Sequence, residues 1–475
     1  MPATPTSRSV CLLMALALVA MPVQAARPKA KQQPARSKAP AVTAMADPAL
    51  PATRCSDDDQ LRLKREPSAT ADTAMAQTDP RAYLVQVAES AMQRSRQVGV
   101  AQLLAQSAAD ELREAELAGL PQVQLNLSGF GVASTVRSVR QPNGAEARVA
   151  LQAAGPIWDW GQRQQLVEWR RQLAEAAQAA RQGQAEQIAL QAVSLSLERS
   201  RNTLQLQVYG QYIRKMACLV EALEAITELD RGRASELVQA QKQQQLAELA
   251  LVATQDQLRS VETRLRRLLG DPLPPVASLS AVLARLPDLG QMQKELLAAS
   301  DVTQANAQAL AAQRLADSVS AGQKPQLSWL ANANLARGNG DNREYAAGVQ
   351  LSIPLFRPTD TPQRDAARRR AEAANLQRDE TLEAKHWRLT EVHDAAQNSL
   401  DRARRIAELL RASQQLRGAT LQQWQQLGRR SLFDVMGAEA DYYSLRVAQV
   451  NALYDAQQAV AMMGSMGKGV LELLR

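Results

Sequence analysis

The feature that most constrains the fold of this chain is an internal duplication. In each half, strand-like segments are followed by a proline–aromatic phrase and then by a long run with helical periodicity. Pro156 in G-P-I-W-D-W-G and Pro354 in S-I-P-L-F-R-P are 198 residues apart, and the phrases G-R-A-S-E-L and G-R-R-S-L-F begin 196 residues apart. Because separate features recur in the same order, the sequence predicts two copies of one structural unit, at 79–275 and 276–475.

Long runs rich in Ala, Gln, Leu, Arg and Glu fill most of the chain after residue 80. Apolar residues recur in these runs at spacings of three and four, which is typical of amphipathic α-helices. Residues 161–228 are a nearly uninterrupted example, and about 65 helical residues extend for about 100 Å. Gly183 and Gly210 are candidates for local breaks or bends in this helix. The sequence therefore predicts a mainly helical protein with rods longer than a globular enzyme usually needs.

Four segments alternate apolar and polar residues with the period of a β-strand. They form two predicted hairpins, at about 120–154 and about 325–356. In L-P-Q-V-Q-L-N-L-S-G, Val123, Leu125 and Leu127 share one face, whereas Gln and Asn side chains lie on the other. Half-buried hairpins in a soluble α+β domain give the same alternation. The sequence offers no companion sheet or short helix for the apolar faces, which favours strands that face lipid.

Four strands cannot close a barrel, for which about eight are needed. Open sheet edges are not tolerated in lipid, so several copies of the chain must each contribute four strands. The predicted fold class is therefore mainly α with a small antiparallel β part, in an oligomer whose strands form one membrane barrel continued by long helices. The polar strand faces, rich in Gln, Asn and Ser, indicate a conduit.

The N-terminal segment predicts export. Residues 1–25 contain a short basic region, an apolar run of about 14 residues, and Val23 and Ala25 at the −3 and −1 positions of a cleavage site, the layout of a signal peptide. A membrane anchor is the alternative, but the apolar run is shorter than the roughly 20 residues that a helical span needs. Residues 26–78 form a basic Ala/Pro-rich tail that the composition predicts to be disordered. A tail that binds the cell wall or lipid is the alternative.

Much of the net charge of +8 comes from this tail, and aromatic residues make up only 3% of the chain. The remainder therefore lacks the basic surface typical of nucleic-acid binding. Cys55 in the tail and Cys218 in the first long helix are the two cysteines outside the signal peptide. In an oxidising compartment they are a candidate disulfide, and two free thiols are the alternative.

No group of residues suggests catalysis. The sequence contains no nucleophile–base constellation, no phosphate-binding loop and no metal-ligand spacing, and its two histidines, His386 and His393, are most simply solvated. We therefore expect no enzyme activity, no cofactor and no metal site.

Several phrases occur in the order found in one protein family: L-P-Q-V-Q-L-N-L-S-G, G-P-I-W-D-W-G-Q-R before a long helix, S-I-P-L-F, and G-R-R-S-L-F-D-V-M-G-A-E-A-D-Y-Y-S-L-R with the ending M-G-S-M-G-K-G-V-L-E-L-L. Over about 80–475 the chain resembles the TolC family of outer-membrane channels. The resemblance implies a homotrimer whose 12-stranded β-barrel, four strands from each chain, crosses the outer membrane of a Gram-negative bacterium. It also implies a periplasmic α-helical barrel, a periplasmic adaptor (membrane fusion) protein, and an inner-membrane ABC transporter or proton-driven pump.

The resemblance assigns the two helix–helix turns to the periplasmic tip, where adaptor docking and gating occur in the family. Asp434 matches the position whose carboxylates ring the narrow entrance, and Arg430 matches a position that holds neighbouring helices together in the closed state. Glu236 is the candidate partner of Arg430. Gly437 departs from the family pattern, which often has a second acidic residue there. The predicted docking residues are Gly232, Arg233 and Ser235 in the first turn and Gly428, Arg429 and Ser431 in the second.

The first turn can be aligned with the second in two ways. Matching G-R-x-S aligns Ser235 with Ser431, whereas matching the acidic residue aligns Glu236 with Asp434 and implies a shorter loop. A solvated charge cluster is the alternative interpretation of the charged residues in the second turn. The glycines of both turns are interpreted as permitting a tight turn of the backbone.

The phrases G-R-A-S-E-L-V-Q-A and L-R-R-L-L-G-D-P-L-P resemble family members that serve type I secretion of large adhesins. We therefore predict the outer-membrane exit duct of a tripartite type I secretion system, which passively conducts an exported protein. The outer-membrane component of a multidrug or small-molecule efflux pump is the alternative. A periplasmic coiled-coil scaffold explains the helices but not two matched hairpins.

Overall fold

The computed structural model describes residues 79–132, 135–136, 139–140, 144–338, 342–427 and 431–475. All of them belong to one compact unit, Thr53–Arg475, and the other unit, Met1–Ala52, lies outside the described residues. The predicted signal peptide and the basic tail also lie outside them.

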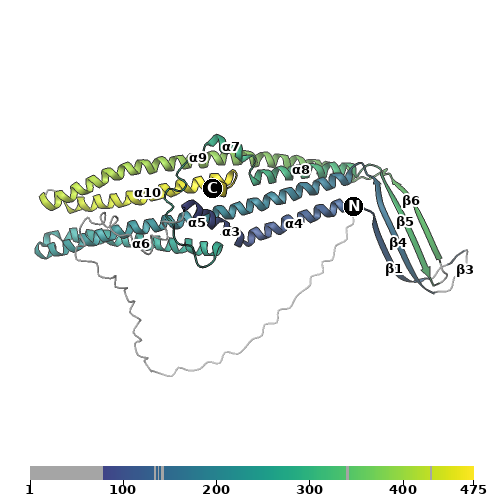
Figure 1. Ribbon diagram of the computed structural model, residues 1–475, viewed down its shortest axis with the longest axis horizontal. Helices are drawn as coiled ribbons and strands as arrows, with labels where there is room; N and C mark the ends of the chain where they lie inside the picture. The colour runs from purple at the N-terminus through teal and green to yellow at the C-terminus, as the bar shows by residue number, and fades with distance from the viewer. Residues whose placement is uncertain (1–78, 133–134, 137–138, 141–143, 339–341, 428–430) are drawn as a thin grey trace, which may run out of the picture. The chain divides into compact units, whose positions relative to one another are not determined.

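The same order of elements occurs twice along the chain (Figure 1). The first half contains α3 (Pro80–Arg94), α4 (Arg96–Leu117), β1 (Gln122–Val132), β4 (Gly144–Trp158), α5 (Gln162–Leu229) and α6 (Ala234–Leu269). The second half contains α7 (Leu289–Leu296), α8 (Ser300–Ala321), β5 (Gln326–Arg337), β6 (Asn342–Ser352), α9 (Asp360–Leu427) and α10 (Leu432–Met466). Short elements complete the described part: β2 (Thr135–Val136), β3 (Val139–Arg140), η1 (Arg231–Arg233) and α11 (Val470–Leu474).

The two longest helices, α5 and α9, each contain 68 residues, which confirms the long helix predicted from the periodicity of the first half. Of the breaks or bends predicted at Gly183 and Gly210, a break is excluded, because α5 runs through both positions. A mid-helix glycine costs only about 1 kcal/mol, and packing along the helix outweighs that cost. Gly183 also allows close packing, since a Cβ there would lie 3.1 Å from the Ser300 Oγ of α8.

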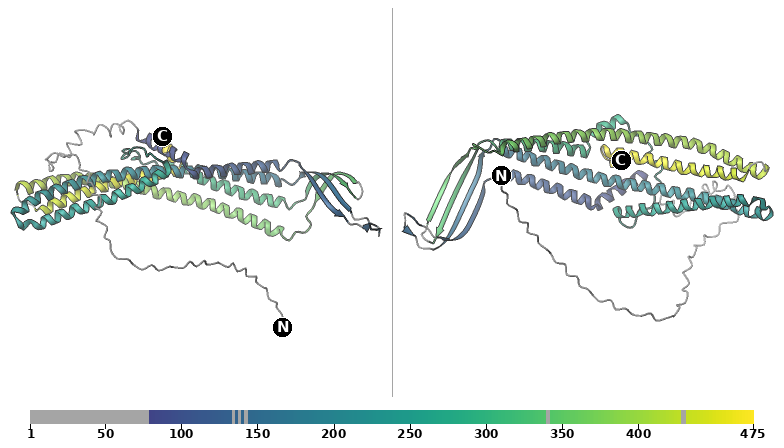
Figure 2. Two further views of the ribbon diagram at one scale, coloured as in Figure 1. Left: turned by 90° about the horizontal axis from the view of Figure 1, so that it is seen from below. Right: turned by 180° about the vertical axis from the view of Figure 1, so that it is seen from behind.

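The four main strands form one antiparallel sheet in the order β1-β4-β5-β6. The β4–β5 pairing joins the two halves of the chain, and the register places Leu125 opposite Leu151, Leu151 opposite Ala333, and Ala333 opposite Tyr345. The apolar positions of all four strands therefore share one face, which we call the apolar face. Leu127 on this face is 71% exposed. The predicted one-sided alternation is thus confirmed, and among the described elements none covers the apolar face (Figure 2).

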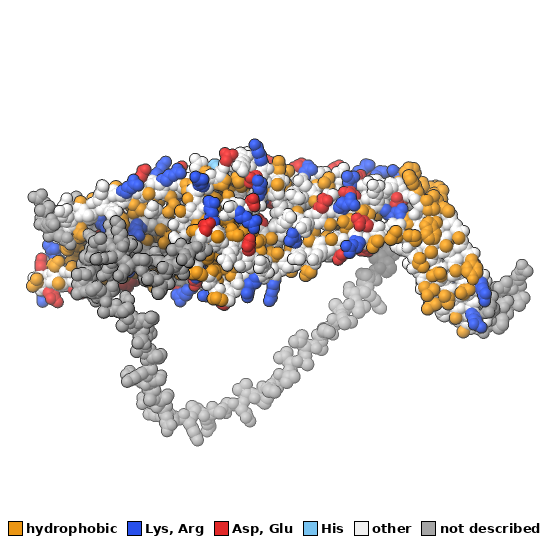
Figure 3. Space-filling view, in the orientation of Figure 1, with side chains coloured by type: hydrophobic (Ala, Val, Ile, Leu, Met, Phe, Trp, Pro, Cys, Tyr) orange, Lys and Arg blue, Asp and Glu red, His pale blue; other side chains and the backbone are white. Residues whose placement is uncertain are grey.

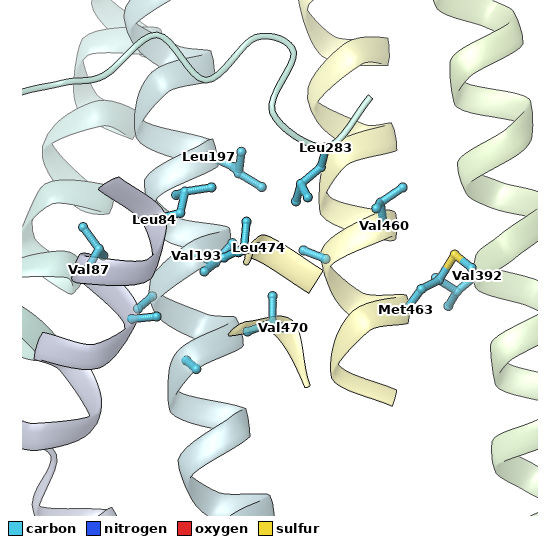
Figure 4. Packing of buried hydrophobic residues seen from close by; sticks show 14 of the residues in the cluster. Leu84, Val87, Val193, Leu197, Leu283, Val392, Val460, Met463, Val470 and Leu474 are labelled. Atoms are coloured by element: carbon cyan, nitrogen blue, oxygen red, sulfur yellow. The ribbon is translucent and has the colours of Figure 1, made fainter. Parts of the chain in front are cut away.

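The main hydrophobic core lies where helices of the two halves meet, and combines residues of α3, α5, α9, α10 and α11 (Figure 4). Leu197 and Val460 are almost completely buried, and burial of such a side chain contributes about 1.5–3 kcal/mol. The segment between α6 and α7 is tied to this core, because Leu279 N donates to Ser200 Oγ (3.3 Å), which lies 2.7 Å from Tyr454 Oη. The two halves therefore fold around a shared centre.

In Figures 1 and 2 the sheet lies beyond one end of the long helices, and the C-terminal end of α5 and the N-terminal ends of α6 and α10 lie at the other end. None of the helices in the described part of the chain is both long enough and apolar enough to cross a bilayer.

Candidate functional site

The first predicted turn is a single turn of 3₁₀ helix, η1, between α5 and α6. Asp230 caps it, because its carboxylate accepts a hydrogen bond from Gly232 N at 2.9 Å, and Arg233 lies 3.9 Å from the same carboxylate. Gly232 does not adopt the left-handed backbone that glycine permits. It relieves a close contact instead, since a Cβ there would lie 3.1 Å from Asp230 Oδ1. Ser235 is exposed in the first turn of α6.

The second predicted turn precedes α10, and Gly428, Arg429 and Arg430 lie outside the described residues. Ser431 is the N-cap of α10: Phe433 N donates to Ser431 Oγ (3.0 Å), and Ser431 N donates to Asp434 Oδ2 (3.3 Å). This reciprocal arrangement is a capping box, which stabilises a helix start by satisfying otherwise unpaired backbone donors. Asp434 is exposed, so capping and a role at an entrance are compatible.

The helices next to the two predicted turns share one buried cluster, which we call the tip cluster. Ala240 of α6 and Leu432, Val435 and Met436 of α10 pack there with residues of α5. Residues separated by nearly the whole repeat length thus meet in one core. The equivalence of the two turns stays a prediction, because residues 428–430 lie outside the described residues.

Glu236 lies half-buried in the first turn of α6, and its Oε2 atom is buried without a hydrogen-bond partner in the structure as described. A carboxylate near a helix N-terminus is stabilised by the helix dipole. The ion pair between Glu236 and Arg430 stays a prediction, because Arg430 lies outside the described residues.

The tip cluster also contains a buried ion pair that the sequence reasoning missed. Arg417 of α9 lies 3.5 Å from Glu439 of α10, and their side chains are only 15% and 0% exposed. The Arg417 guanidinium also lies 4.5 Å from the ring centroid of Tyr442. Arg417 and Glu439 lie at equal distances in sequence on either side of position 428, so a helical hairpin that turns there brings them together. That symmetry is the signal by which the pair could have been found.

Tyr212 and Tyr443 lie beside this ion pair, with their ring centroids 4.9 Å apart. Their raised pKa values predict a transition of the tip at alkaline pH. Burial, and then the charges of Glu439 and Asp441, raise the pKa of Tyr212 to about 12. Burial and the Glu439 charge, partly offset by two arginines, raise the pKa of Tyr443 to about 12. In the folded chain these two tyrosines keep protons that unfolded tyrosines lose near pH 10. The contribution of the two neutral tyrosines to the stability of the tip is therefore complete below about pH 10, and it is lost as the pH rises towards 12.

We therefore expect amide exchange in 432–447 to accelerate between about pH 10 and 12, after correction for intrinsic exchange, together with a late rise in tyrosinate absorbance. The variant Tyr212→Phe/Tyr443→Phe is the control. It is expected to remove the acceleration of exchange and to reduce the late rise in absorbance, the remainder of which comes from Tyr83 and Tyr454, because burial raises their pKa values too. Tyrosinate absorbance that is complete near pH 10 in the wild-type protein would contradict the prediction.

The junction between sheet and helices is held by contacts between the two halves. Trp160 adopts a left-handed backbone (φ 56°), and its Nε1 donates to Pro325 O at 2.7 Å. Trp158 and Trp160 are exposed, next to the apolar face. Trp169 is instead half-buried on α5, with the Arg170 guanidinium 4.3 Å from its ring centroid. Only the first two tryptophans therefore have the exposure of an interfacial aromatic belt.

The face of the sheet opposite the apolar face is polar. Its rows, read from the register, include Gln124 opposite Gln152 and Gln152 opposite Asn332. Arg148 on this face forms an ion pair with Glu146 at 2.9 Å. The sheet therefore offers hydrogen-bonding groups on one side and hydrocarbon on the other.

Cys218 is buried in α5 and disulfide-bonded. Its bonding partner lies outside the described residues, so the pairing of Cys218 with Cys55 stays a prediction.

No protein-family model matches the sequence, and no curated protein matches it. Solved structures do match. The outer-membrane protein VceC of Vibrio cholerae is 19% identical, with a TM-score of 0.71 over 82% of this chain and 97% of that chain. CusC, described in terms of transmembrane channel formation, is 18% identical, with a TM-score of 0.73 over 81% of this chain and 92% of that chain.

A third structure is the open state of the MtrE outer-membrane channel of Neisseria gonorrhoeae. It is 14% identical, with a TM-score of 0.68 over 82% of this chain and 90% of that chain. Each of the three alignments covers more than four-fifths of this chain, which confirms the predicted fold class. This chain therefore has the fold of the TolC-family outer-membrane channels.

Proposed function

We propose that this chain is an outer-membrane channel of a Gram-negative bacterium, and that it works as a passive exit duct. The observation that carries the proposal is the sheet with one exposed apolar face and one polar face, joined to long helices in the fold of outer-membrane channels. The apolar face meets lipid, and the polar face lines a water-filled lumen. A passive duct does no chemical work, so the energy for export comes from an inner-membrane partner.

The functional unit is a homotrimer. The outer strands β1 and β6 each have one unpaired edge in a single chain, and open edges in lipid are costly because their backbone groups lack partners. Three copies with four strands each form a closed barrel of 12 strands. Exposed leucines on α4, α6 and α9 favour contact with neighbouring copies along the helices: Leu103, Leu104, Leu246, Leu249, Leu409 and Leu416.

The cargo of the duct is small molecules. The similar solved structures include the efflux channels CusC, OprN, CmeC and MtrE, and this supports the efflux alternative better than type I secretion, which rests on the tip phrases alone. The partners are a periplasmic adaptor protein that docks at the tip and an inner-membrane pump.

Biochemical and genetic measurements test this function. In fractionated cells the protein is expected in the outer membrane, and a purely soluble periplasmic pool would refute the channel. The purified protein is expected to run as a heat-sensitive trimer and to conduct ions in planar bilayers. Deletion of the gene is expected to sensitise the source bacterium to toxic small molecules. Unchanged sensitivity with loss of a surface-exposed protein would instead support type I secretion.

Asp434 is the proposed gate residue. Three Asp434 carboxylates around the trimer axis repel one another and bind cations. Because Asp434 also caps α10, its two roles must be separated. Asp434→Asn removes the charge and keeps an oxygen acceptor, whereas Ser431→Ala removes the N-cap hydroxyl and keeps the charge, at a cost of about 1 kcal/mol.

We expect Asp434→Asn to weaken divalent-cation block of the conductance at least tenfold, and Ser431→Ala to leave the block within twofold of the wild type. Planar-bilayer titrations with magnesium measure both. Equal effects of the two variants would assign Asp434 to capping alone and remove it from the gate.

A further inference from the structure

Two arginines lie on the apolar face of the sheet, at the end farthest from the helices. Arg337 is the last residue of β5, and Arg343 is the second residue of β6. The register pairs Leu335 with Arg343, so Arg337, two residues beyond Leu335, is the diagonal neighbour of Arg343 on the same face. Diagonal neighbours are about 7–8 Å apart, and at that spacing two guanidinium groups can hold one phosphate between them. Figure 3 shows Lys or Arg side chains at this end of the hydrophobic sheet.

Neither arginine has a counter-charge in the described part of the sheet. Both side chains are exposed. The acidic residues of the described strands are Glu146 and Glu344, and the register places both on the polar face, opposite Phe130 and Asn334. An unpaired arginine in the middle of a bilayer is destabilising, because its charge loses its hydration there. The pair is therefore stable only where anionic groups or water meet it.

The position of the pair along the strands corresponds to the headgroup level. Leu327 and Arg337 are ten residues apart on β5, which is about 33 Å of strand, or about 25 Å along the membrane normal at a tilt of about 40°. That is the height of the apolar band of an outer-membrane barrel. Trp158 pairs with Leu327 at the helix end of this band. At the other end Tyr345, 73% exposed, lies two residues inside Arg343.

The surroundings of Arg337 leave room for a headgroup. Its neighbour on β4 is Ala147, and the neighbour of Ala147 on β1 is Gly129. A Cβ on Gly129 would meet no atom within 4 Å. Small residues thus lie beside the two arginines on the apolar face, and the aromatic ring of Tyr345 and the apolar side chains follow towards the helices.

We propose that Arg337 and Arg343 bind a phosphate of the anionic glycolipid of the outer leaflet, the lipid A part of lipopolysaccharide. The proposal rests on the proposed channel function, which places this end of the sheet in the outer leaflet. Guanidinium groups match phosphate through paired hydrogen bonds, and the acyl chains of the lipid continue along the apolar face. Three copies of the pair around the trimer make a ring of such sites that anchors the barrel at a fixed depth.

The test is binding of purified lipid A to the detergent-solubilised trimer, measured by native mass spectrometry. The probes are bisphosphorylated lipid A, lipid A with both phosphates removed, and phosphatidylglycerol. Arg337→Gln/Arg343→Gln is compared with Arg148→Gln, a matched control that removes an arginine from the polar face at the neighbouring register position. We expect the double variant to lose at least tenfold in affinity for bisphosphorylated lipid A. Arg148→Gln is expected to keep the wild-type affinity, which would show that the loss depends on the arginine pair. Lipid A without phosphates is expected to bind the wild type and the double variant equally, which would show that the loss depends on the phosphates.

Unchanged lipid A binding by the double variant would overturn the proposal, and equal affinity of the wild type for phosphatidylglycerol would overturn the choice of a glycolipid. Trimer formation and conductance are measured on the same samples. If the wild type neither enters membranes nor conducts, the channel function fails, whereas conduction with arginine-independent binding refutes the lipid site alone. If the glutamine variant does not assemble, Arg337→Lys/Arg343→Lys, which keeps the charge, is used in its place. An affinity loss of more than a third of that expected for the glutamine variant would support paired guanidinium recognition. Affinity equal to that of the wild type would overturn it.

Discussion

Glu439→Ala is expected to destabilise the end of α10 that faces the tip by about 3–5 kcal/mol, because it leaves the Arg417 charge buried without its partner carboxylate. Arg417 is only 15% exposed and Glu439 is fully buried, so water cannot replace the lost interaction. Amide exchange in 432–447 measures the local free energy of opening. Local exchange is preferable to a melting temperature, since an assembled membrane trimer does not unfold in two states.

Two further variants make this prediction specific to the buried pair. Arg417→Leu/Glu439→Leu removes both charges and is expected to recover at least half of the loss, because an apolar pair of similar volume leaves no buried charge. Arg404→Ala breaks the exposed pair with Asp401 on the same helix and is expected to cost less than about 1 kcal/mol. A double variant as unstable as Glu439→Ala would show that burial of the charge is not the cause.

Gly338→Ala is expected to disrupt the far end of the β4–β5 pairing by about 3 kcal/mol or more. Gly338 has a positive φ of 151°, a region that costs other residues about 1–3 kcal/mol. A Cβ there would lie 2.2 Å from Ala145 O and 2.9 Å from Glu146 Cα. Both are backbone atoms, so no change of rotamer relieves the contact, and the strands must separate. The β4–β5 pairing joins the two halves of the sheet, so we expect less assembled trimer.

Gly348→Ala is the matched control, because a Cβ on Gly348 would meet no atom within 4 Å. The yield of heat-sensitive trimer in the membrane fraction compares the two variants. We expect Gly338→Ala to lower this yield severalfold and Gly348→Ala to leave it unchanged. Equal yields would mean that the far end of the sheet tolerates separation of β4 and β5.

The sequence reasoning succeeded where the signal is local and periodic. Alternation of Val123, Leu125 and Leu127 with polar residues is a property of neighbouring residues, and it identified the apolar face of the sheet before any pairing was known. The local signal did not decide whether Gly183 and Gly210 interrupt the helix, because local helix propensity is a weak preference that the packing of a long helix overrides. The phrase S-L-F-D, by contrast, was interpreted only through family resemblance, although a hydroxyl residue followed three positions later by an acid is itself a helix-start signal.

The sequence by itself determined the duplicated order of elements, the length of the helices and the two-sided strands, since each follows from the periodicity of the residues. Only the tertiary structure decided that β4 pairs with β5, that Arg417 and Glu439 are buried together, and that Arg337 and Arg343 share the end of the apolar face. These facts depend on which strand edges and helix faces meet. The periodicity of a single segment does not specify its partner: the sequence can place Arg417 and Glu439 at one level of a helical hairpin, but only the packed fold shows that they are buried together.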